Sequence, residues 1–200
     1  MNTMKIKPAQ SHHAIQAARL IRLSGEAAFD HIFSEDHGPK NTVFLSTCFS
    51  SPHTVFSHKH HFVIAEDNNV MAILSLVTKR DHDQCFLSTA WYIFNNYGLR
   101  SIFKGLKFEM KLVKPPKKGV LYIAHVAVHE SQRGKGLGQQ LIQFSINTAL
   151  NRGIKTLALD VRADNYNAIA LYELYGFKQM ALNKSYHTSL NDHLYMEKQL

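Results

Sequence analysis

The sequence predicts an α/β fold that contains a pair of parallel strands. The main observation is the order strand, helix, strand, helix, strand after residue 119, because a helix that connects two strands usually brings them parallel. An apolar hairpin pattern at residues 62–78 adds antiparallel strands. With 200 residues, 45% of them hydrophobic, the chain can form one domain with a sizeable core. We therefore expect a single domain over residues 1–200.

The chain begins with a short strand and a helix. "MKIKP" favours a strand, and "SHHAIQAARLIRLS" has helical spacing at Ile15, Ala18 and Leu23. Ser11 is the expected N-cap of this helix, because its hydroxyl can accept a hydrogen bond from a free backbone N–H group of the first turn.

A hairpin and a helical segment come next. Strands at Phe62–Glu66 and Val70–Thr78 flank "DNN", whose asparagines tolerate positive φ. From about residue 81 to 118 the pattern is helical, then aromatic and basic. This predicts a helical insertion at about 81–118, between the two halves of the sheet.

The second half of the chain alternates strands and helices. "VLYIAHVAV", at residues 120–128, is nearly all apolar, as expected for a strand that is covered on both faces. A helix over Gly138–Arg152 follows, then the strand "KTLALDVRA" and a helix that starts near Asp164 or Asn165 and ends at Gly176. "FKQMAL" and "DHLYMEKQ" predict the last two strands.

Composition excludes several classes of protein. Cys48 and Cys85 lie far apart and outside any CxxC pattern, so we expect reduced, structural thiols. His58, His60 and His61 have no cysteine or carboxylate at ligand spacing, which favours a solvated loop cluster over a metal site. The chain starts without a signal-peptide core and has no run of about 18 apolar residues, so we expect a cytoplasmic protein without a membrane span.

Glycines stand where a strand is followed by a helix, in "VAVHESQRGKGLGQQLIQFSI". Gly134, Gly136 and Gly138 allow positive φ and a close approach of a ligand to the backbone, and the start of the next helix offers free N–H groups. Such a turn binds anions, and Arg133 and Lys135 add the positive charge that suits a pyrophosphate. Neither a Walker loop nor a dinucleotide fingerprint has this spacing.

This spacing, at Arg133, Gly136 and Gly138, resembles the acetyl-CoA loop of the GNAT superfamily of N-acetyltransferases. A second motif of that family follows in register, as Asn165 and then "LYELYGF" at Leu171–Phe177. The best-matched region is about residues 120–182. "LALDVRADNYNAIALYELYGF" looks like the ribosomal-protein alanine acetyltransferase branch, although the long insertion does not. The resemblance implies a mixed, mostly antiparallel central sheet with a splayed parallel strand pair and helices on both faces.

The resemblance also implies that acetyl-CoA is the cosubstrate, and that no metal is required. The splayed strand would pair with the pantetheine arm, the glycine turn would bind the pyrophosphate, and the start of the second helix would contact the pantetheine. The residues implied by this correspondence are Val126, Ala127, Val128, Arg133, Gly134, Lys135, Gly136, Leu137, Gly138 and Asn165.

Acetyl transfer to an amine requires a neutral amine, a stabilised oxyanion and a proton for the departing thiolate. A backbone N–H near Val126 or Ala127 is the simplest oxyanion donor. Tyr172 stands at the position of the family's general acid, and the alternative is a core residue, as we expect for Tyr175 on the same helix.

The general base stays open. Several family members have a glutamate at the position that corresponds to Tyr122, where this chain has no carboxylate. His125 has a suitable reference pKa of about 6.5, but strand alternation places it on the opposite face unless a bulge redirects it. Asp160, on the neighbouring strand, is a third candidate, although pairing with Arg162 or Lys155 would make it structural. A water chain is the fourth.

A basic amphipathic helix is predicted at residues 99–111. Arg100, Lys104, Lys107 and Lys111 fall on one stripe, and Leu99, Ile102, Phe103, Leu106 and Met110 lie largely on the other side. The stripe could guide an acidic acceptor or rest on a membrane surface. We favour a lid helix that packs on the sheet and keeps its charged face in solvent.

The predicted function is acetyl transfer from acetyl-CoA to a primary amine, by direct attack in a ternary complex. The acceptor could be a small molecule, a protein N-terminus or a lysine, and a homodimer is left open. One alternative is a catalytically silent CoA-binding regulatory protein. The other is a basic nucleic-acid-binding module, suggested by the net charge of +8 but lacking any such signature.

Overall fold

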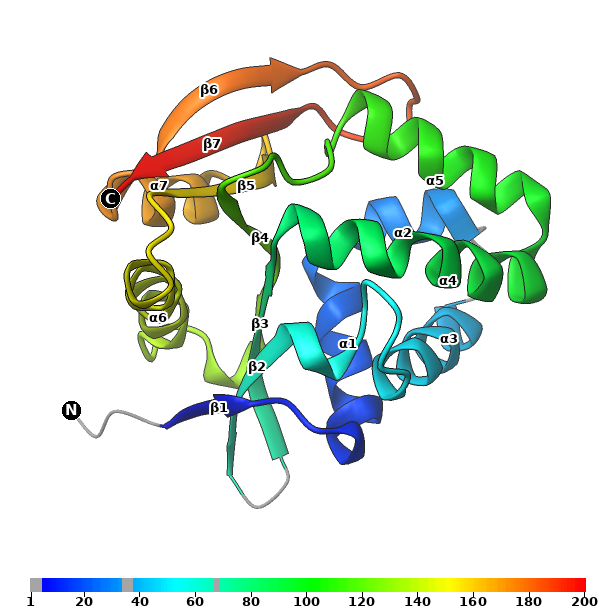
Figure 1. Cartoon of the computed structure of the whole chain (residues 1–200), viewed down its shortest axis with the longest axis horizontal. Helices are drawn as coiled ribbons and strands as arrows, with labels where there is room; N and C mark the ends of the chain where they lie inside the picture. Colours follow the sequence, from blue (N-terminus) through cyan, green and yellow to red (C-terminus); the bar gives the residue numbers. More distant parts are fainter. Residues whose placement is uncertain (1–4, 34–37, 67–68) are drawn as a thin grey trace.

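A seven-stranded mixed sheet forms the centre of the protein in the computed structural model, which describes residues 5–33, 38–66 and 69–200 (Figure 1). The strand order is β1-β2-β3-β4-β5-β7-β6. All neighbouring strands are antiparallel except β4 and β5, as expected. The strands are β1 (Ile6–Pro8), β2 (His61–Glu66), β3 (Asn69–Val77), β4 (Val120–Val128), β5 (Thr156–Arg162), β6 (Lys178–Asn183) and β7 (His193–Gln199).

Helices cover both faces of the sheet, which confirms the predicted architecture (Figure 1). The helices on one face are α1 (Ala14–Ser24), α2 (Glu26–Phe33), α3 (Gly38–Ser50), α4 (Lys79–Tyr97) and α5 (Leu99–Lys111). Those on the other are α6 (Leu137–Asn151) and α7 (Tyr166–Leu174). Helices α4 and α5 occupy the segment between the hairpin and β4, and the sequence did not predict α2 or α3.

Two hydrophobic clusters lie on the two sides of the sheet. Alternate residues of β3 separate them, since Leu74 belongs to the cluster beneath α6 and α7 and Ile73 to the cluster beneath α1 and α3. Both side chains are fully buried. Burial on both faces explains why the central strands are nearly continuous apolar runs.

Two details of the first helix differ from the prediction. A 3-10 helix, Ser11–His13, precedes α1, and His13 rather than Ser11 occupies the cap of α1. Ile15 is 64% exposed, while Ala17 and Ile21 are fully buried. Ala18 is fully buried and Leu23 partly buried, as predicted, so only Ile15 was assigned to the wrong face. Residues 67 and 68 of the "DNN" turn lie outside the described residues.

None of the helices in the described ranges is long and apolar enough to cross a membrane.

Candidate active site

The parallel strands β4 and β5 separate at one end. Their pairing runs from Val120 with Thr156 to Ile123 with Leu159 and then stops, although β4 continues to Val128 and β5 to Arg162. From residue 124 onward, the edge of β4 that faces β5 therefore has no strand partner. A cavity of about 230 Å³ lies at this opening, between the two strands and α7. We call it the strand cavity.

Several of the predicted cosubstrate-binding residues line the strand cavity. They are Val126, Ala127, Val128, Gly138 and Asn165. The Asn165 side chain also caps α7, because its Oδ1 accepts a hydrogen bond from the backbone N–H of Ala168 at 3.2 Å. The side-chain amide of Asn165 thus caps the N-terminus of α7 at the rim of the strand cavity.

The glycine turn lies between a 3-10 helix, Glu130–Gln132, and the start of α6. Gly134 and Gly136 have φ values of 77° and 78°, in the left-handed region that favours glycine, and Gly136 is the N-cap of α6. Arg133 and Lys135 are exposed, and their only described partners are Glu130 at 4.0 Å and Gln132 at 2.9 Å. The turn combines free helix N–H groups with two exposed cations, which fits a pyrophosphate.

Tyr172 reaches the strand cavity from α7. The residue is 8% exposed, its ring packs on Phe177 at 5.8 Å, and no described residue holds its hydroxyl by a hydrogen bond. Burial raises the pKa of Tyr172 to about 12. The hydroxyl is therefore protonated at neutral pH and available as a donor.

A bulge in β4 decides where His125 points. Ser75 of β3 pairs with His125, but the next residue, Leu76, pairs with Ile123, so Ala124 is an extra residue in β4. Strand alternation resumes one position late, and Tyr122 and His125 consequently line the same cavity. A bulge was only a possibility from the sequence, and the structure contains one in β4.

That second cavity has a volume of about 290 Å³ and lies on the opposite face of the sheet, beneath α2, α4 and α5. We call it the helix cavity. It is lined mostly by apolar side chains. Ala124, Asp160 and His193 line both cavities, as do Ser24, Gly25 and Ala28 where α1 meets α2, so the two cavities meet at the gap between β4 and β5 on the side of α2.

Asp160 is the carboxylate at this junction. Its Oδ2 accepts a hydrogen bond from the Tyr122 hydroxyl at 2.8 Å, and its Oδ1 is buried without a hydrogen bond. Burial raises the pKa of Asp160 to about 7. The expected pairing with Arg162 or Lys155 is wrong, because Arg162 instead binds Asp164 at 2.7 Å while Asp160 points across the parallel pair to Tyr122.

Burial and the adjacent Asp160 hold the pKa of Tyr122 well above its ordinary value. Tyr122 is therefore a hydrogen-bond donor at neutral pH, and it is a poor candidate for the base.

His125 belongs to a short chain of hydrogen bonds. His61 Nδ1 donates to the carbonyl of Ser57 at 2.7 Å, so in the neutral ring Nε2 of His61 is an acceptor. His125 Nδ1 lies 3.3 Å from that atom and must donate to it, which leaves His125 Nε2 unprotonated. Burial lowers the pKa of His125 to about 4 and holds that of His61 well below its ordinary value. Both rings are neutral at pH 7.

The histidine group at residues 58–61 is structural rather than a solvated loop cluster. His58 bonds the carbonyl of Phe49 at 2.9 Å, His60 contacts Cys85 Sγ at 3.5 Å, and His61 is buried. Both cysteines are free and buried, as expected. Within the described ranges, no group of three or more histidine, cysteine or acidic side chains could hold a metal ion.

The basic stripe of α5 is only partly in solvent. Lys104 Nζ donates to the carbonyl of His31 at 2.7 Å, and Lys107 Nζ lies 4.5 Å above the Tyr186 ring. The apolar side is also not buried as predicted, since three of its members are more than half exposed: Leu99 (59%), Phe103 (67%) and Met110 (66%). The other two members of the predicted apolar side, Ile102 and Leu106, do line the helix cavity, together with Glu109.

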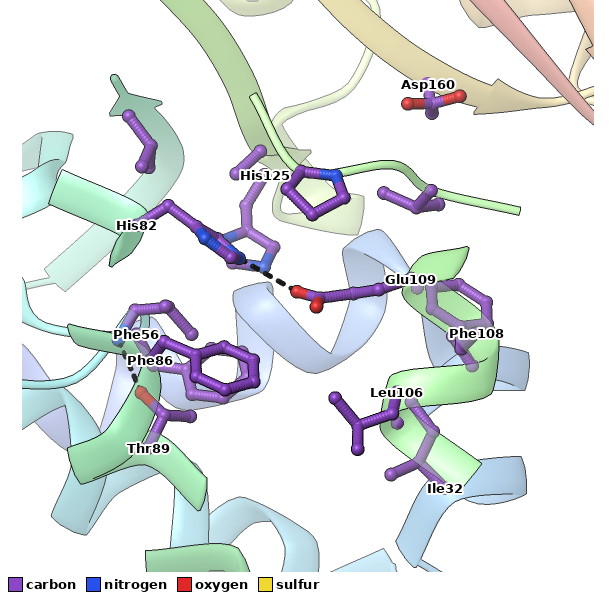
Figure 2. A pocket seen from close by; sticks show the side chains of 18 of the residues that line it. Ile32, Phe56, His82, Phe86, Thr89, Leu106, Phe108, Glu109, His125 and Asp160 are labelled. Carbon is purple, nitrogen blue, oxygen red and sulfur yellow. Dashed lines mark hydrogen bonds and ion pairs between the residues drawn. The ribbon is translucent and has the colours of Figure 1, made fainter. Parts of the chain in front are cut away.

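An ion pair between His82 of α4 and Glu109 of α5 was not predicted. The His82 Nε2 and Glu109 Oε1 atoms are 2.9 Å apart across the helix cavity, as Figure 2 shows. The hydrogen bond with Glu109 raises the pKa of His82. No sequence pattern indicates this pair, because its members lie on different helices and far apart in the chain.

Comparisons with known proteins agree on one family. A sequence model of the acetyltransferase (GNAT) family matches residues 27–177. The ribosomal protein bS18-alanine N-acetyltransferase of Salmonella typhimurium is 38% identical over 69 residues, which are 34% of this chain and 47% of that protein. The chain thus spans about half the length of this relative.

Solved structures agree with the fold. One acetyltransferase structure has a TM-score of 0.73 at 20% identity and covers 98% of both chains. The NatC complex bound to Gag peptide and CoA has a TM-score of 0.58 at 14% identity, again over 98% of both chains. At these identities the likeness shows the fold alone.

Proposed function

The chain belongs to the acetyltransferase (GNAT) family, and from this premise we propose that it transfers the acetyl group of acetyl-CoA to a primary amine in a ternary complex. The observation that carries the proposal is the meeting of two cavities at the gap between β4 and β5, with Asp160 lining both. Acetyl-CoA enters from the strand cavity and the amine from the helix cavity. The two substrates therefore reach the junction through two different cavities.

The strand cavity suits the extended, phosphate-bearing cosubstrate. The unpaired edge of β4 at Val126, Ala127 and Val128 offers backbone groups to the amides of the pantetheine arm, in the way that an added strand would pair. The turn from Arg133 to Gly138 offers the start of α6 to the pyrophosphate. Asn165 stands at the rim, next to the arm.

The junction supplies the groups that the chemistry needs. Asp160, with a pKa of about 7 and a free Oδ1, accepts the proton that the attacking ammonium must lose. His125 Nε2 accepts a second hydrogen bond from the amine, and its neutral ring does not repel that cation. The amine nitrogen then bonds to the thioester carbonyl carbon, whose oxygen becomes the oxyanion, and collapse of this tetrahedral species breaks the carbon–sulfur bond.

Two further groups stabilise the oxyanion and supply the proton for the departing thiolate. A backbone N–H of β4 near Val126 or Ala127 stabilises the oxyanion. Tyr172 donates its phenolic proton to the departing sulfur. Proton removal and proton donation are thus assigned to two different groups, Asp160 of β5 and Tyr172 of α7.

The proposal extends to the whole described chain. The sheet runs without interruption from β1 to β6, which supports one domain over residues 1–200 with α4 and α5 as a helical insertion at about 81–118. We place the protein in the cytoplasm, with an amine-bearing small molecule or protein as its partner.

The direct test incubates the protein with acetyl-CoA and a panel of primary amines. We expect release of free CoA to match the mass-detected N-acetylated amine in a ratio of one to one. CoA binding without acetyl transfer to any amine would overturn the enzymatic proposal and favour a silent CoA-binding protein.

Removing the two exposed cations of the glycine turn should weaken CoA binding. We expect the Arg133→Ala, Lys135→Ala double variant to bind CoA about tenfold more weakly, the size expected for charge-assisted hydrogen bonds to exposed side chains. Calorimetry at two salt concentrations measures the effect, which should shrink as salt rises. The matched control is Arg152→Ala with Lys155→Ala, two exposed cations beyond the opposite end of α6. If both double variants lose the same CoA affinity, the glycine turn is not part of the CoA-binding site.

Glycine substitutions test the same turn less cleanly. A valine at Gly136 would be strained at a φ of 78° whether or not a ligand binds. The side-chain variants avoid this backbone effect.

A further inference from the structure

We propose that the acceptor is a small primary amine with an apolar, aromatic-sized body, which the helix cavity encloses. This inference rests on the proposed function and names the class of substrate that the same site takes. It depends on the shape, the lining and the charge of the helix cavity.

The walls of the helix cavity are apolar on several sides. Ile32 comes from α2, Phe86 from α4, Leu106 from α5 and Phe56 from the loop before β2, and Figure 2 shows these side chains around one space. The volume of about 290 Å³ is at the lower end of the range of roughly 300–1,000 Å³ for small-molecule sites. Apolar walls around a volume of this size match one ring or a short alkyl chain.

The charge of the cavity argues against a polyamine. Among the described residues that line it, the carboxylates are Glu109 and Asp160. Glu109 is already paired with His82 at 2.9 Å, and Asp160 serves the reacting amine at the junction. A second cation on the acceptor would lie against apolar walls without a free carboxylate, which is unfavourable.

The backbone of the cavity argues against an extended peptide. A peptide N-terminus would bring amide groups that need hydrogen-bond partners. The walls from α2, α4 and α5 are helical, and the backbone groups of helix interiors already bond within the helix. The cavity also has non-helical walls at residues 55–56 and 113–116. There the N–H groups of Val55 and Val113 already donate to Thr89 and Phe108, and Pro115 and Pro116 have no N–H. A single amine at the end of an apolar body needs polar partners only at the junction, where Asp160 and His125 lie.

The basic stripe of α5 does not change this conclusion. Lys104 is held by the carbonyl of His31 and Lys107 by the ring of Tyr186. Neither residue lines the helix cavity. Selection by the insertion therefore comes from its inward side, which is mostly apolar and carries Lys114 and the His82–Glu109 pair, rather than from the basic stripe.

The test compares kcat/KM at saturating acetyl-CoA for 2-phenylethylamine, n-hexylamine, spermidine and a peptide with a free N-terminal alanine. We expect the first two amines to be at least tenfold better than the last two. A peptide or spermidine that exceeds both apolar amines would overturn this inference while leaving the proposed function intact.

A matched pair of variants locates the site. Phe86→Ala removes a ring from the cavity wall and should raise KM for 2-phenylethylamine about tenfold or more, with KM for acetyl-CoA unchanged. Phe94→Ala removes a ring from the exposed side of the same helix and should change neither KM. Equal KM values for Phe86→Ala and the wild type would overturn the inference.

A binding measurement separates this inference from the proposed function. Saturation-transfer NMR with 2-phenylethylamine and free CoA, which has no acetyl group to transfer, should show binding of the amine to the wild type. This binding should be lost in Phe86→Ala. If no amine is acetylated but this binding is seen, the proposed function fails and the apolar ligand site stands. If the wild type does not bind 2-phenylethylamine, the inference fails.

Discussion

Replacing Asp160 with Asn is expected to lower kcat/KM about 10²- to 10⁴-fold for every acceptor, because an amide cannot accept the proton of the ammonium. The amide oxygen can still accept the hydrogen bond of the Tyr122 hydroxyl. Packing is therefore preserved, and initial-rate kinetics with CoA release measure the loss. CoA affinity should not change. The control is Asp83→Asn, an exposed carboxylate of α4 that pairs with Lys79, which should keep full activity.

The pH dependence follows from the same group. With a pKa of about 7, Asp160 becomes an ionised base as the pH rises through neutrality, so kcat/KM should increase across that range. In Asp160→Asn the rise in kcat/KM near pH 7 should be absent, and only the pH dependence that comes from ionisation of the amine substrate should remain. If kcat/KM of the variant still rises near pH 7, the base is another group.

Asp160→Asn should also stabilise the fold at alkaline pH. The folded pKa of about 7 lies above the ordinary 3.8, so the folded protein holds a proton that the unfolded chain releases. Stability is then lost as the pH rises from about 4 through 7, and asparagine removes this loss. At about 1.4 kcal/mol per pKa unit, discounted for partial exposure, we expect a gain of about 2–4 kcal/mol at pH 8.

Urea unfolding of both proteins at pH 8 and at pH 4 measures this gain. The gain should be present at pH 8 and nearly absent at pH 4, where the folded wild type is protonated and the unfolded carboxyl, with its ordinary pKa of 3.8, is close to half protonated. A variant that is less stable at pH 8 and fully active would make Asp160 a structural residue.

Replacing Tyr172 with Phe should lower kcat about 10²-fold or more, because the ring remains but the proton for the departing sulfur is lost. CoA affinity and unfolding free energy should stay close to wild type, since no described residue bonds this hydroxyl. Tyr175→Phe on the same segment is the matched control, as Tyr175 packs partly buried against the same core. A decrease of less than about threefold in Tyr172→Phe would make Tyr172 a core residue.

Local patterns were sufficient for the features that depend on neighbouring residues in the chain. The glycine turn, the cap at Asn165 and the strands of the second half were predicted because a turn, a cap and an apolar run are each decided by a few adjacent residues. The parallel pair followed from the alternation of strands and helices. Helix α3 was missed because "NTVFLSTCFS" is rich in residues of low helix propensity, and the packing of Phe44 and Phe49 into the core outweighs that propensity.

The proposed reaction centre depended instead on contacts between distant residues. The bulge at Ala124 is defined only by the pairing of β4 with β3, and it places His125 beside Tyr122. The hydrogen bond between Tyr122 and Asp160 requires the parallel pair, and the raised pKa of Asp160 requires its burial.

The sequence by itself determined the family, the succession of strands and helices in the second half of the chain and the turn proposed to bind CoA, because each is encoded by adjacent residues. Only the tertiary structure decided which carboxylate lies at the junction and which side of α5 faces the helix cavity. Burial, strand register and helix rotation arise from packing between segments far apart in the chain, and no local pattern contains that information.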